Sequence, residues 1–220
     1  MSIRPRSDRL TGKLAELISK AALLSVFVSA SFLKTQDMVI IVRRLVGSLS
    51  LVVALLLCCK PAFSADAGPI VISVPPGFEG PAQEEANGGV NVAWIERQPV
   101  FGGGTLLQVS AIDVGSTLDG ITQAQRLEGA THYLLEFLRS VGQSLSNFQF
   151  GEFESVSLAG LPAARVRWTA TTASGHAAIG VIYCVLVGHS VVNLQTRDTG
   201  TAITPAMYAA ISAIEGVRVR

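Results

Sequence analysis

The chain has 220 residues, a formal net charge of +1 and 49% hydrophobic residues. Residues 1–65 hold nine basic and three acidic residues (net +6), whereas residues 66–220 hold eight arginines, no lysine and thirteen acids (net −5). The acidic second part argues against nucleic acid and against anionic lipid as partners, because both attract a basic face. Its length fits one domain with a single core.

Residues 38–67 have the tripartite pattern of a secretory signal peptide. Arg43 and Arg44 supply positive charge, and residues 45–59 are apolar and uncharged. Small residues follow two apart, at 62 and 64 and, as the better match, at 65 and 67. We therefore expect cleavage between Ser64 and Gly68 and a periplasmic or secreted bacterial protein. The alternative is an uncleaved inner-membrane anchor, although the run is shorter than the roughly 18–20 apolar residues of a spanning helix.

Two further features of the leader bear on its processing. A cysteine pair at 58–59 invites lipidation, but a leucine precedes it where a small residue is needed. A complete signal begins at Met38, so we expect residues 1–37 to be a non-native or disordered N-terminal extension. The mature domain is then 68–220.

Seven segments of the mature part alternate apolar and polar residues or are apolar throughout. The predicted strands are 69–77, 90–96, 105–113, 148–156, 165–171, 176–187 and 190–196. Segment 176–187 is apolar on both faces, as a central covered strand would be. Polar residues at 79–89 predict a loop, glycines at 102–104 predict a hairpin turn, and Gly151 predicts a bulge.

Two segments have helical periodicity. One runs over 116–141, where Ser116 and Asp119 resemble a capping box and Gly142 marks the end. The other begins at Thr204 and ends at Gly216. The predicted fold class is α+β: an antiparallel sheet of about six to seven strands packed with one long and one C-terminal helix.

Element order and three phrases resemble the PsbP-like and DcrB-like group of exported proteins. The phrases are "SVPPGF", "LAGLPAARVRWTATTASG" and "GVIYCVLVGHSVVNLQTR". The resemblance implies a PsbP-like α/β/α sandwich and a binding or accessory role rather than an enzymatic one. It supplies no catalytic residue. The leader is bacterial rather than plastid, which departs from the photosystem members of the group.

The residues that could carry chemistry are few. His132 and Glu136 stand four apart on the long helix and could hold a metal, but two ligands make no site. His176 and His189 lie at opposite ends of a long strand. Cys184 falls inside an apolar strand, which favours a buried thiol over a nucleophile and leaves the domain without an internal disulfide.

Four charges form the most distinctive polar pattern. Glu152 and Glu154 alternate on one strand, and Arg165 and Arg167 alternate on its neighbour. The pattern is typical of cross-strand ion pairs, and a patch that binds a partner is the sharper hypothesis. Trp168 alternates with the arginines, so we expect it in the core.

The sequence therefore predicts a non-enzymatic exported accessory or binding protein of the cell envelope. We expect it to need no metal or other cofactor and to bind an envelope protein or a small ligand. It would meet a membrane only through an uncleaved leader. The alternatives are a membrane-anchored structural protein and, less favoured, a small metal-assisted enzyme that uses His132 and Glu136.

Overall fold

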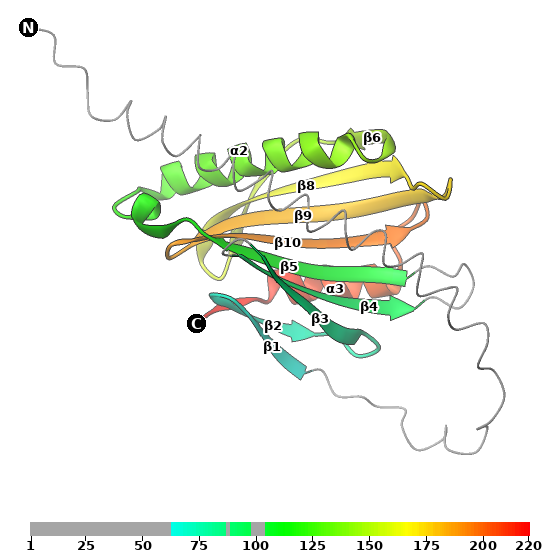
Figure 1. Cartoon of the computed structure of the whole chain (residues 1–220), viewed down its shortest axis with the longest axis horizontal. Helices are drawn as coiled ribbons and strands as arrows, with labels where there is room; N and C mark the ends of the chain where they lie inside the picture. Colours follow the sequence, from blue (N-terminus) through cyan, green and yellow to red (C-terminus); the bar gives the residue numbers. More distant parts are fainter. Residues whose placement is uncertain (1–62, 87–88, 98–103) are drawn as a thin grey trace, which may run out of the picture.

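The computed structural model describes residues 63–86, 89–97 and 104–220. An eight-stranded sheet has the order β3-β4-β5-β10-β9-β8-β6, with β7 also paired to β8, and a small sheet has the order β1-β2-β11 (Figure 1). All the pairings are antiparallel. The strands are β1 (Phe63–Ala67), β2 (Ile70–Val74), β3 (Glu79–Ala86), β4 (Gly89–Arg97), β5 (Gly104–Asp113), β6 (Ser146–Phe150), β7 (Glu154–Leu158), β8 (Leu161–Thr171), β9 (Ala177–Val187), β10 (Ser190–Thr199) and β11 (Arg218–Val219).

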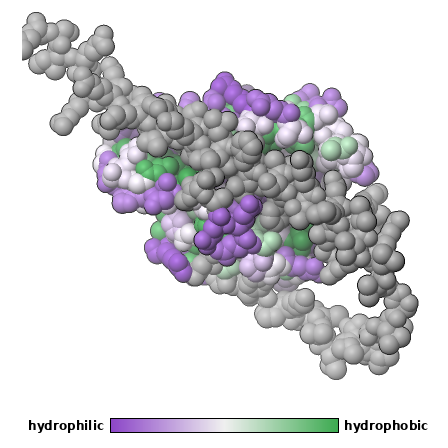
Figure 2. Space-filling view, viewed as in Figure 1, coloured by the Kyte–Doolittle hydropathy of each residue, from purple (hydrophilic) through white to green (hydrophobic). Residues whose placement is uncertain are grey.

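Helices pack on opposite faces of the large sheet, which makes an α+β sandwich as predicted. Helix α2 (Gln123–Gly142) packs on β8, β9 and β6, while α3 (Pro205–Glu215) packs on β10, β5 and β2. A short 3-10 helix, η2 (Gly115–Leu118), precedes α2. In the space-filling view, hydrophilic residues follow the outward side of α2 (Figure 2).

The large sheet has eight strands rather than six or seven. The predicted strand 69–77 is instead β2 of the small sheet, the predicted strand 148–156 forms two strands, and residues 79–86 form strand β3 and not a loop. β3 pairs with β4 at the edge of the sheet, and Gln83, Glu84 and Glu85 are exposed. Edge strands are commonly polar, since charge discourages pairing with another chain. That polarity made β3 look like a loop in the sequence.

The predicted strand 148–156 is two strands, β6 and β7. Residues 151–153 separate them, and the two strands pair with different halves of β8. Gly151 therefore marks a break rather than a bulge within one strand. Within β6, Phe148 is half-buried and Phe150 is 40% exposed.

The long helix starts later than predicted. Its N-cap is Thr122, whose hydroxyl accepts from the Gln125 amide N–H at 3.3 Å, and Gln125 Oε1 accepts from the Thr122 N–H at 2.9 Å. This capping box replaces the predicted one at Ser116, which lies in η2. The C-terminal helix follows the prediction, with Thr204 at its N-cap and Gly216 at its C-cap.

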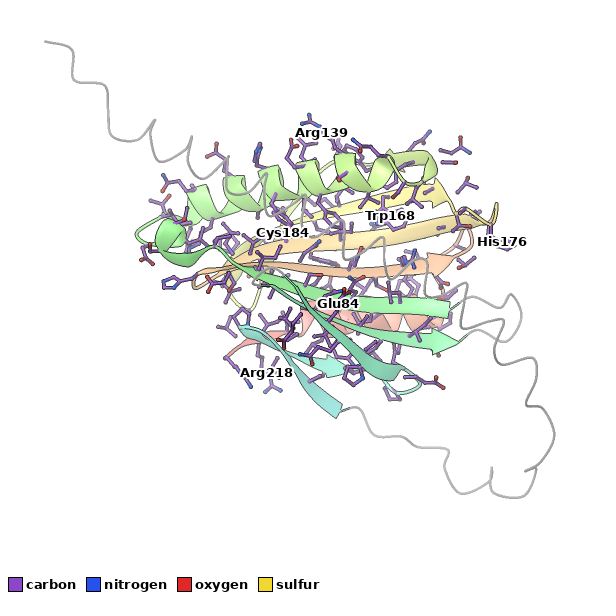
Figure 3. The ribbon with its side chains drawn as sticks, in the orientation of Figure 1. Glu84, Arg139, Trp168, His176, Cys184 and Arg218 are labelled. Carbon is purple, nitrogen blue, oxygen red and sulfur yellow. The ribbon has the colours of Figure 1, made fainter. Side chains whose placement is uncertain are left out.

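The core prediction for Trp168 is confirmed: it is 4% exposed and lies between α2 and the sheet (Figure 3). Cys184 is fully buried on the same side and is a free thiol. The predicted central strand, β9, is buried along most of its length. Trp168 pairs with Gly180, and a Cβ at Gly180 would come within 2.2 Å of the indole ring.

The predicted signal peptide overlaps the described fold. β1 pairs with β2, and Ala67 is fully buried against the core. Residues 1–37, the rest of the leader up to residue 62, and most of the predicted turn at 102–104 lie outside the described residues. None of the helices in the described ranges has the length and apolarity to cross a membrane.

Candidate functional site

The two faces of the large sheet carry different side chains at its centre. Toward α3, strands β4, β5 and β10 present apolar side chains, such as Val92, Val109 and Leu194. Toward α2, the same strands present amides and a hydroxyl. We call this second set the polar face, and it consists of Asn91, Gln108, Ser110, Asn193 and Gln195.

Strand register brings the polar face together from three segments far apart in sequence. Asn91 pairs with Ser110, and Ser110 pairs with Asn193. In the next row Gln108 pairs with Gln195. All five side chains are at most 8% exposed, so the polar groups need hydrogen-bond partners.

A directional hydrogen-bond chain joins four of the five residues. Gln195 Nε2 donates to Gln108 Oε1 at 2.9 Å, and Gln108 Nε2 donates to Asn91 Oδ1 at 2.7 Å. Ser110 Oγ donates to the same Asn91 oxygen at 2.9 Å. The chain fixes the orientation of each amide and leaves the Asn91 NH₂ group pointing away from it.

Two polar atoms of this face have no hydrogen-bond partner among the described residues: Asn91 Nδ2 and Asn193 Oδ1. They stand on either side of Ser110. A buried polar atom left unpaired costs about 1–3 kcal/mol. Such atoms in a folded protein call for a specific explanation, and binding of another molecule is one.

The apolar half of the same sheet side lies next to the polar face. On β8 and β9 it holds Val166, Trp168, Ile182 and Cys184, which pack under α2. The Trp168 indole lies over Gly180, and its Nε1 has no partner in the described structure. Arg197 pairs with Gly180 across from β10, and burial lowers the pKa of Arg197 to about 10. Amides, an arginine and an aromatic ring therefore share one side of the sheet.

Buried polar groups toward α3 have structural roles or stand alone. Asp198 Oδ2 accepts hydrogen bonds from the hydroxyls of Thr105, at 3.1 Å, and of Thr204, the N-cap of α3. This arrangement ties the start of α3 to the sheet. Thr196 Oγ1 and Trp94 Nε1, also on the α3 side, lack hydrogen-bond partners in the described structure.

Three of the four predicted patch charges, Glu154, Arg165 and Arg167, lie near the other end of the sheet on the side of α3. Arg165 pairs with Glu154 across β7 and β8, and its Nη1 lies 3.3 Å from Glu215 Oε1 at the end of α3. Arg167 is exposed beside them, and Glu152 is exposed between β6 and β7 without an ion pair in the described structure.

Tyr183 completes the Arg165 cluster. Its hydroxyl donates to Glu215 Oε1 at 2.9 Å, and the Arg165 guanidinium lies 5.9 Å from the centre of its ring. Burial raises the pKa of Tyr183 to about 12, and the hydrogen bond from Arg165 lowers the pKa of Glu154. Arg165 thus contacts two carboxylates and an aromatic ring. These contacts favour a structural role, in which Arg165 holds the end of α3 against the sheet.

The residues considered for metal binding or catalysis include His132 and Glu136, which both lie on α2. Glu136 pairs with Arg139 at 2.6 Å on the surface of α2, and no group of three or more metal-ligand residues occurs in the described ranges. His189 Nε2 lies 2.9 Å from Asp119 Oδ1, and His176 is exposed in the turn before β9.

Cys184 is fully buried in the apolar cluster under α2, and its cross-strand partner on β10 is Asn193. Burial raises the pKa of its thiol, so at neutral pH it is protonated. A protonated buried thiol is a poor nucleophile. The sequence-based interpretation of Cys184 as a small core residue therefore agrees with its surroundings.

Sequence reasoning missed the polar face, although its signal is present. The strings "LLQVSA" and "VVNLQT" each place two polar side chains two residues apart on one side of a strand, and "GVNVAW" places Asn91 on the same side of β4. Such alternation is typical of a sheet with one solvated face. Only the pairing of β4, β5 and β10 shows that the three strings converge and are buried.

The described residues fold into an α/β sandwich, and several solved structures align with it. No protein-family model matches the chain, and no curated protein matches it. LpqN of Mycobacterium tuberculosis, described as involved in cell envelope biogenesis, is 16% identical, with 73% of this chain and 86% of that chain covered and a TM-score of 0.43.

Two further structures align at similar levels. The Saccharomyces cerevisiae Ran-binding protein Mog1p is 10% identical, with 72% and 96% of the two chains covered and a TM-score of 0.47. The Pseudomonas aeruginosa protein PA94, a putative regulator of unknown function, is 11% identical, with 73% and 99% covered and a TM-score of 0.41. At these values the similarities carry no argument about function.

Proposed function

We propose that this chain is a non-enzymatic binding protein of the bacterial cell envelope that holds a ligand or partner against the polar face. The observation that carries the proposal is the buried amide chain, with Asn91 Nδ2 and Asn193 Oδ1 unpaired on either side of Ser110. Such atoms add nothing to stability, since apolar replacements would be at least as stable.

The chemistry of the polar face favours binding over catalysis. Carboxamides and serine hydroxyls donate and accept hydrogen bonds without changing charge near neutral pH. A general acid or base needs a pKa near the working pH, and a nucleophile needs a base beside it. The polar face supplies orientation and specificity, which is what a binding protein requires.

Envelope localisation rests on the leader at 38–67, with its two arginines and uncharged apolar run. The position of β1 favours an earlier cut than the range from Ser64 to Gly68 that the sequence predicts. A cut after Ala67 would remove the whole of β1 and a fully buried alanine, whereas a cut near residues 62–64 would keep most of the strand. We therefore favour the earlier cut, and a membrane-anchored protein with a retained leader is the alternative.

Thermal melts in fractionated envelope extract test the binding proposal. We expect an extract fraction to raise the melting temperature of the native protein, because an occupant that binds only the folded state stabilises it. The shift should disappear in Asn193→Leu and persist in Thr196→Val, a matched change of an unpaired buried group on the opposite side of β10.

Two results would contradict the proposal. One is the absence of a shift with every fraction of the extract. The other is a shift of equal size in the native protein and in Asn193→Leu, which would place the occupant elsewhere. Intact-mass measurement of the exported protein separately distinguishes the cleaved form from the anchored alternative.

A further inference from the structure

The two edges of the large sheet differ in how they are protected from pairing with other chains. At one edge, β3 carries Pro81 and the exposed acids Glu84 and Glu85. Proline and charge are common devices against the addition of a further strand. At the other edge β6 has neither proline nor charge (Figure 1). The uncharged stretch runs from Ser140 to Gly151, across the end of α2 and the whole of β6.

The outer side of β6 has backbone groups that the sheet does not use. The Gly151 N–H donates to the Arg167 carbonyl on β8 at 3.0 Å, and Gln149 pairs with Thr169. Successive residues of a strand direct their N–H and C=O groups to opposite sides of that strand. The backbone groups of Phe150 therefore point away from β8, to a side where no described strand pairs with β6. The register shift in β6 lies before Gln149 and leaves this part regular.

The Phe150 side chain connects this edge to the core. It is the one exposed large hydrophobic residue of the large sheet within the described ranges, at 40% exposure. The centre of its ring lies 6.1 Å from that of Phe148 and 6.0 Å from that of Phe153, and the Phe148 ring lies 5.8 Å from Trp168. Neighbouring rings thus hold Phe150 in place while part of its surface stays open. Aromatic residues are enriched at protein interfaces, so Phe150 suits a contact with another chain.

We infer that β6 pairs in antiparallel fashion with β6 of a second copy of this chain, with Phe150 of the two copies meeting at a twofold axis. Each Phe150 N–H then donates to the Phe150 carbonyl of the other copy, as in a hydrogen-bonded antiparallel pair. The two phenylalanine rings lie side by side on the α2 face. A second copy fits this edge because every copy carries the same uncharged strand, so no like charges meet where the strands pair.

The same register brings complementary side chains together on the α3 face. Gln149 of the second copy lies opposite Gly151, and Arg167 lies on the other side of Gly151. Gly151 has no side chain, so the exposed Arg167 has a free path to the Gln149 amide oxygen, over a Cα separation of about 10 Å. The two Glu152 residues stand on opposite sides of the axis, about 14 Å apart. That separation exceeds the screening length of about 8 Å at physiological salt, so they repel little.

The pairing closes at two copies. A twofold contact uses the same patch on both chains, so both β6 edges are occupied. The shared sheet then ends at β3 on each side, where Glu84 and Glu85 discourage a further strand. The inferred assembly is therefore a dimer and not a growing fibre. The inference goes beyond the proposed function, because β8 and β9 separate β6 from the strands of the polar face.

Sedimentation equilibrium of the exported protein, purified from its host, tests the pairing. We expect a dimer that dissociates on dilution. Phe150→Lys should weaken it by about tenfold or more, because the change removes the aromatic contact and places two like charges at the axis. Tyr208→Lys is the matched control, since Tyr208 is 60% exposed on α3, and it should leave the dissociation constant unchanged. Thermal melts of both variants check that each is folded.

Cysteine cross-linking tests the register and does not depend on a charged variant. Two copies of Phe150→Cys place their Cα atoms about 5.5 Å apart, inside the roughly 4.4–6.8 Å that a disulfide spans. Two copies of Gln149→Cys stand about 8 Å apart, which is too far. Oxidation should therefore join Phe150→Cys into a covalent dimer much faster than Gln149→Cys or Tyr208→Cys. Cys184 is fully buried and should not take part.

Several results would overturn the inference. One is a monomer at every concentration without rapid cross-linking of Phe150→Cys, and another is a dimer that Phe150→Lys leaves intact. Assemblies larger than two copies would contradict the closed pairing, and equal cross-linking at positions 149 and 150 would contradict the register. If the native chain is monomeric and captures a different protein that Phe150→Lys fails to capture, the edge serves another partner and not a second copy.

Discussion

The two sides of strand β10 have different surroundings. We assign one side to the stability of the fold and the other to recognition of a ligand. Val192 and Leu194 point toward α3 into a continuous apolar cluster, while Asn193 and Gln195 point the other way onto the polar face. Both sets are buried to a similar degree. Burial alone therefore does not identify core residues in this domain, and the pairing of the polar atoms is the more informative property.

The comparison also explains how the domain can keep unpaired polar atoms. The α3 face supplies apolar contacts from four central strands and from β2, which is where a fold of this size gains most of its stability. A few unpaired atoms on the other face cost only a few kcal/mol. The domain tolerates that cost because the apolar face is well packed.

The largest expected effect of a single substitution comes from the apolar half of the α2 side. Trp168→Ala should lower the free energy of unfolding by about 3–5 kcal/mol, because it empties a large buried volume under α2. Arg167→Ala, at the adjacent exposed position, should cost less than about 1 kcal/mol. Denaturant melts of both variants measure the difference, and equal losses would mean that the face assignment is wrong.

Gly180 should be intolerant of even the smallest side chain. A methyl group there would come within 2.2 Å of the Trp168 ring, so Gly180→Ala forces the indole or the strand to move. We expect a loss of about 1–3 kcal/mol, the usual cost of overpacking. Gly188→Ala is a poor control because its φ is +54°, so Ser174→Ala in an exposed turn serves instead. Equal melting temperatures for Gly180→Ala and the native protein would contradict the close contact.

The Arg165 cluster predicts a small pH dependence. The hydrogen bond from Arg165 lowers the pKa of Glu154 in the folded state. Glu154 therefore stabilises the fold at pH values above its unfolded-state pKa, and this stabilisation is lost as the pH falls through its folded-state pKa. Because Glu154 is largely exposed, the effect should stay under about 1 kcal/mol. Glu154→Gln should flatten the fall in stability on the acid side of pH 4.5.

Glu96 should show the opposite dependence of stability on pH. Burial, and then the charge of Asp198, raise the pKa of Glu96, so its ionisation above that pKa opposes folding. Glu96→Gln should therefore raise stability at neutral pH and lose that advantage as pH falls. Melts of both variants from pH 3 to pH 7 check the two signs, and a shared direction would show that one assignment is wrong.

Much of the fold was predictable because local patterns and tertiary structure agree. The alternation around Trp168, the uniformly apolar β9 and the capping of α3 by Thr204 and Pro205 each have one structural interpretation. β3 was missed because an exposed edge strand and a loop share the same composition. The start of α2 was misplaced because Ser116 and Thr122 are both acceptable caps.

The candidate site was less predictable, for a physical reason. The charges at Glu154 and Arg165 stand out in sequence because each is unusual within a strand, and they do pair. Asn193 and Gln195 do not stand out, since polar residues alternate along most half-buried strands. Their convergence depends on the register of β10 against β5, which the sequence alone does not specify.

The central claim is that the polar face serves binding and not the stability of the fold. The most direct test compares two neighbouring residues of β10. Asn193 makes no side-chain hydrogen bond in the described structure, and its Oδ1 is buried and unpaired, whereas Leu194 is fully buried in the α3 cluster. Urea melts should show Leu194→Ala losing about 2–5 kcal/mol. Asn193→Leu should keep or gain about 1 kcal/mol while losing stabilisation by envelope extract. A loss of about 2 kcal/mol or more in Asn193→Leu, with stabilisation by extract retained, would show that Asn193 serves the fold and not a ligand.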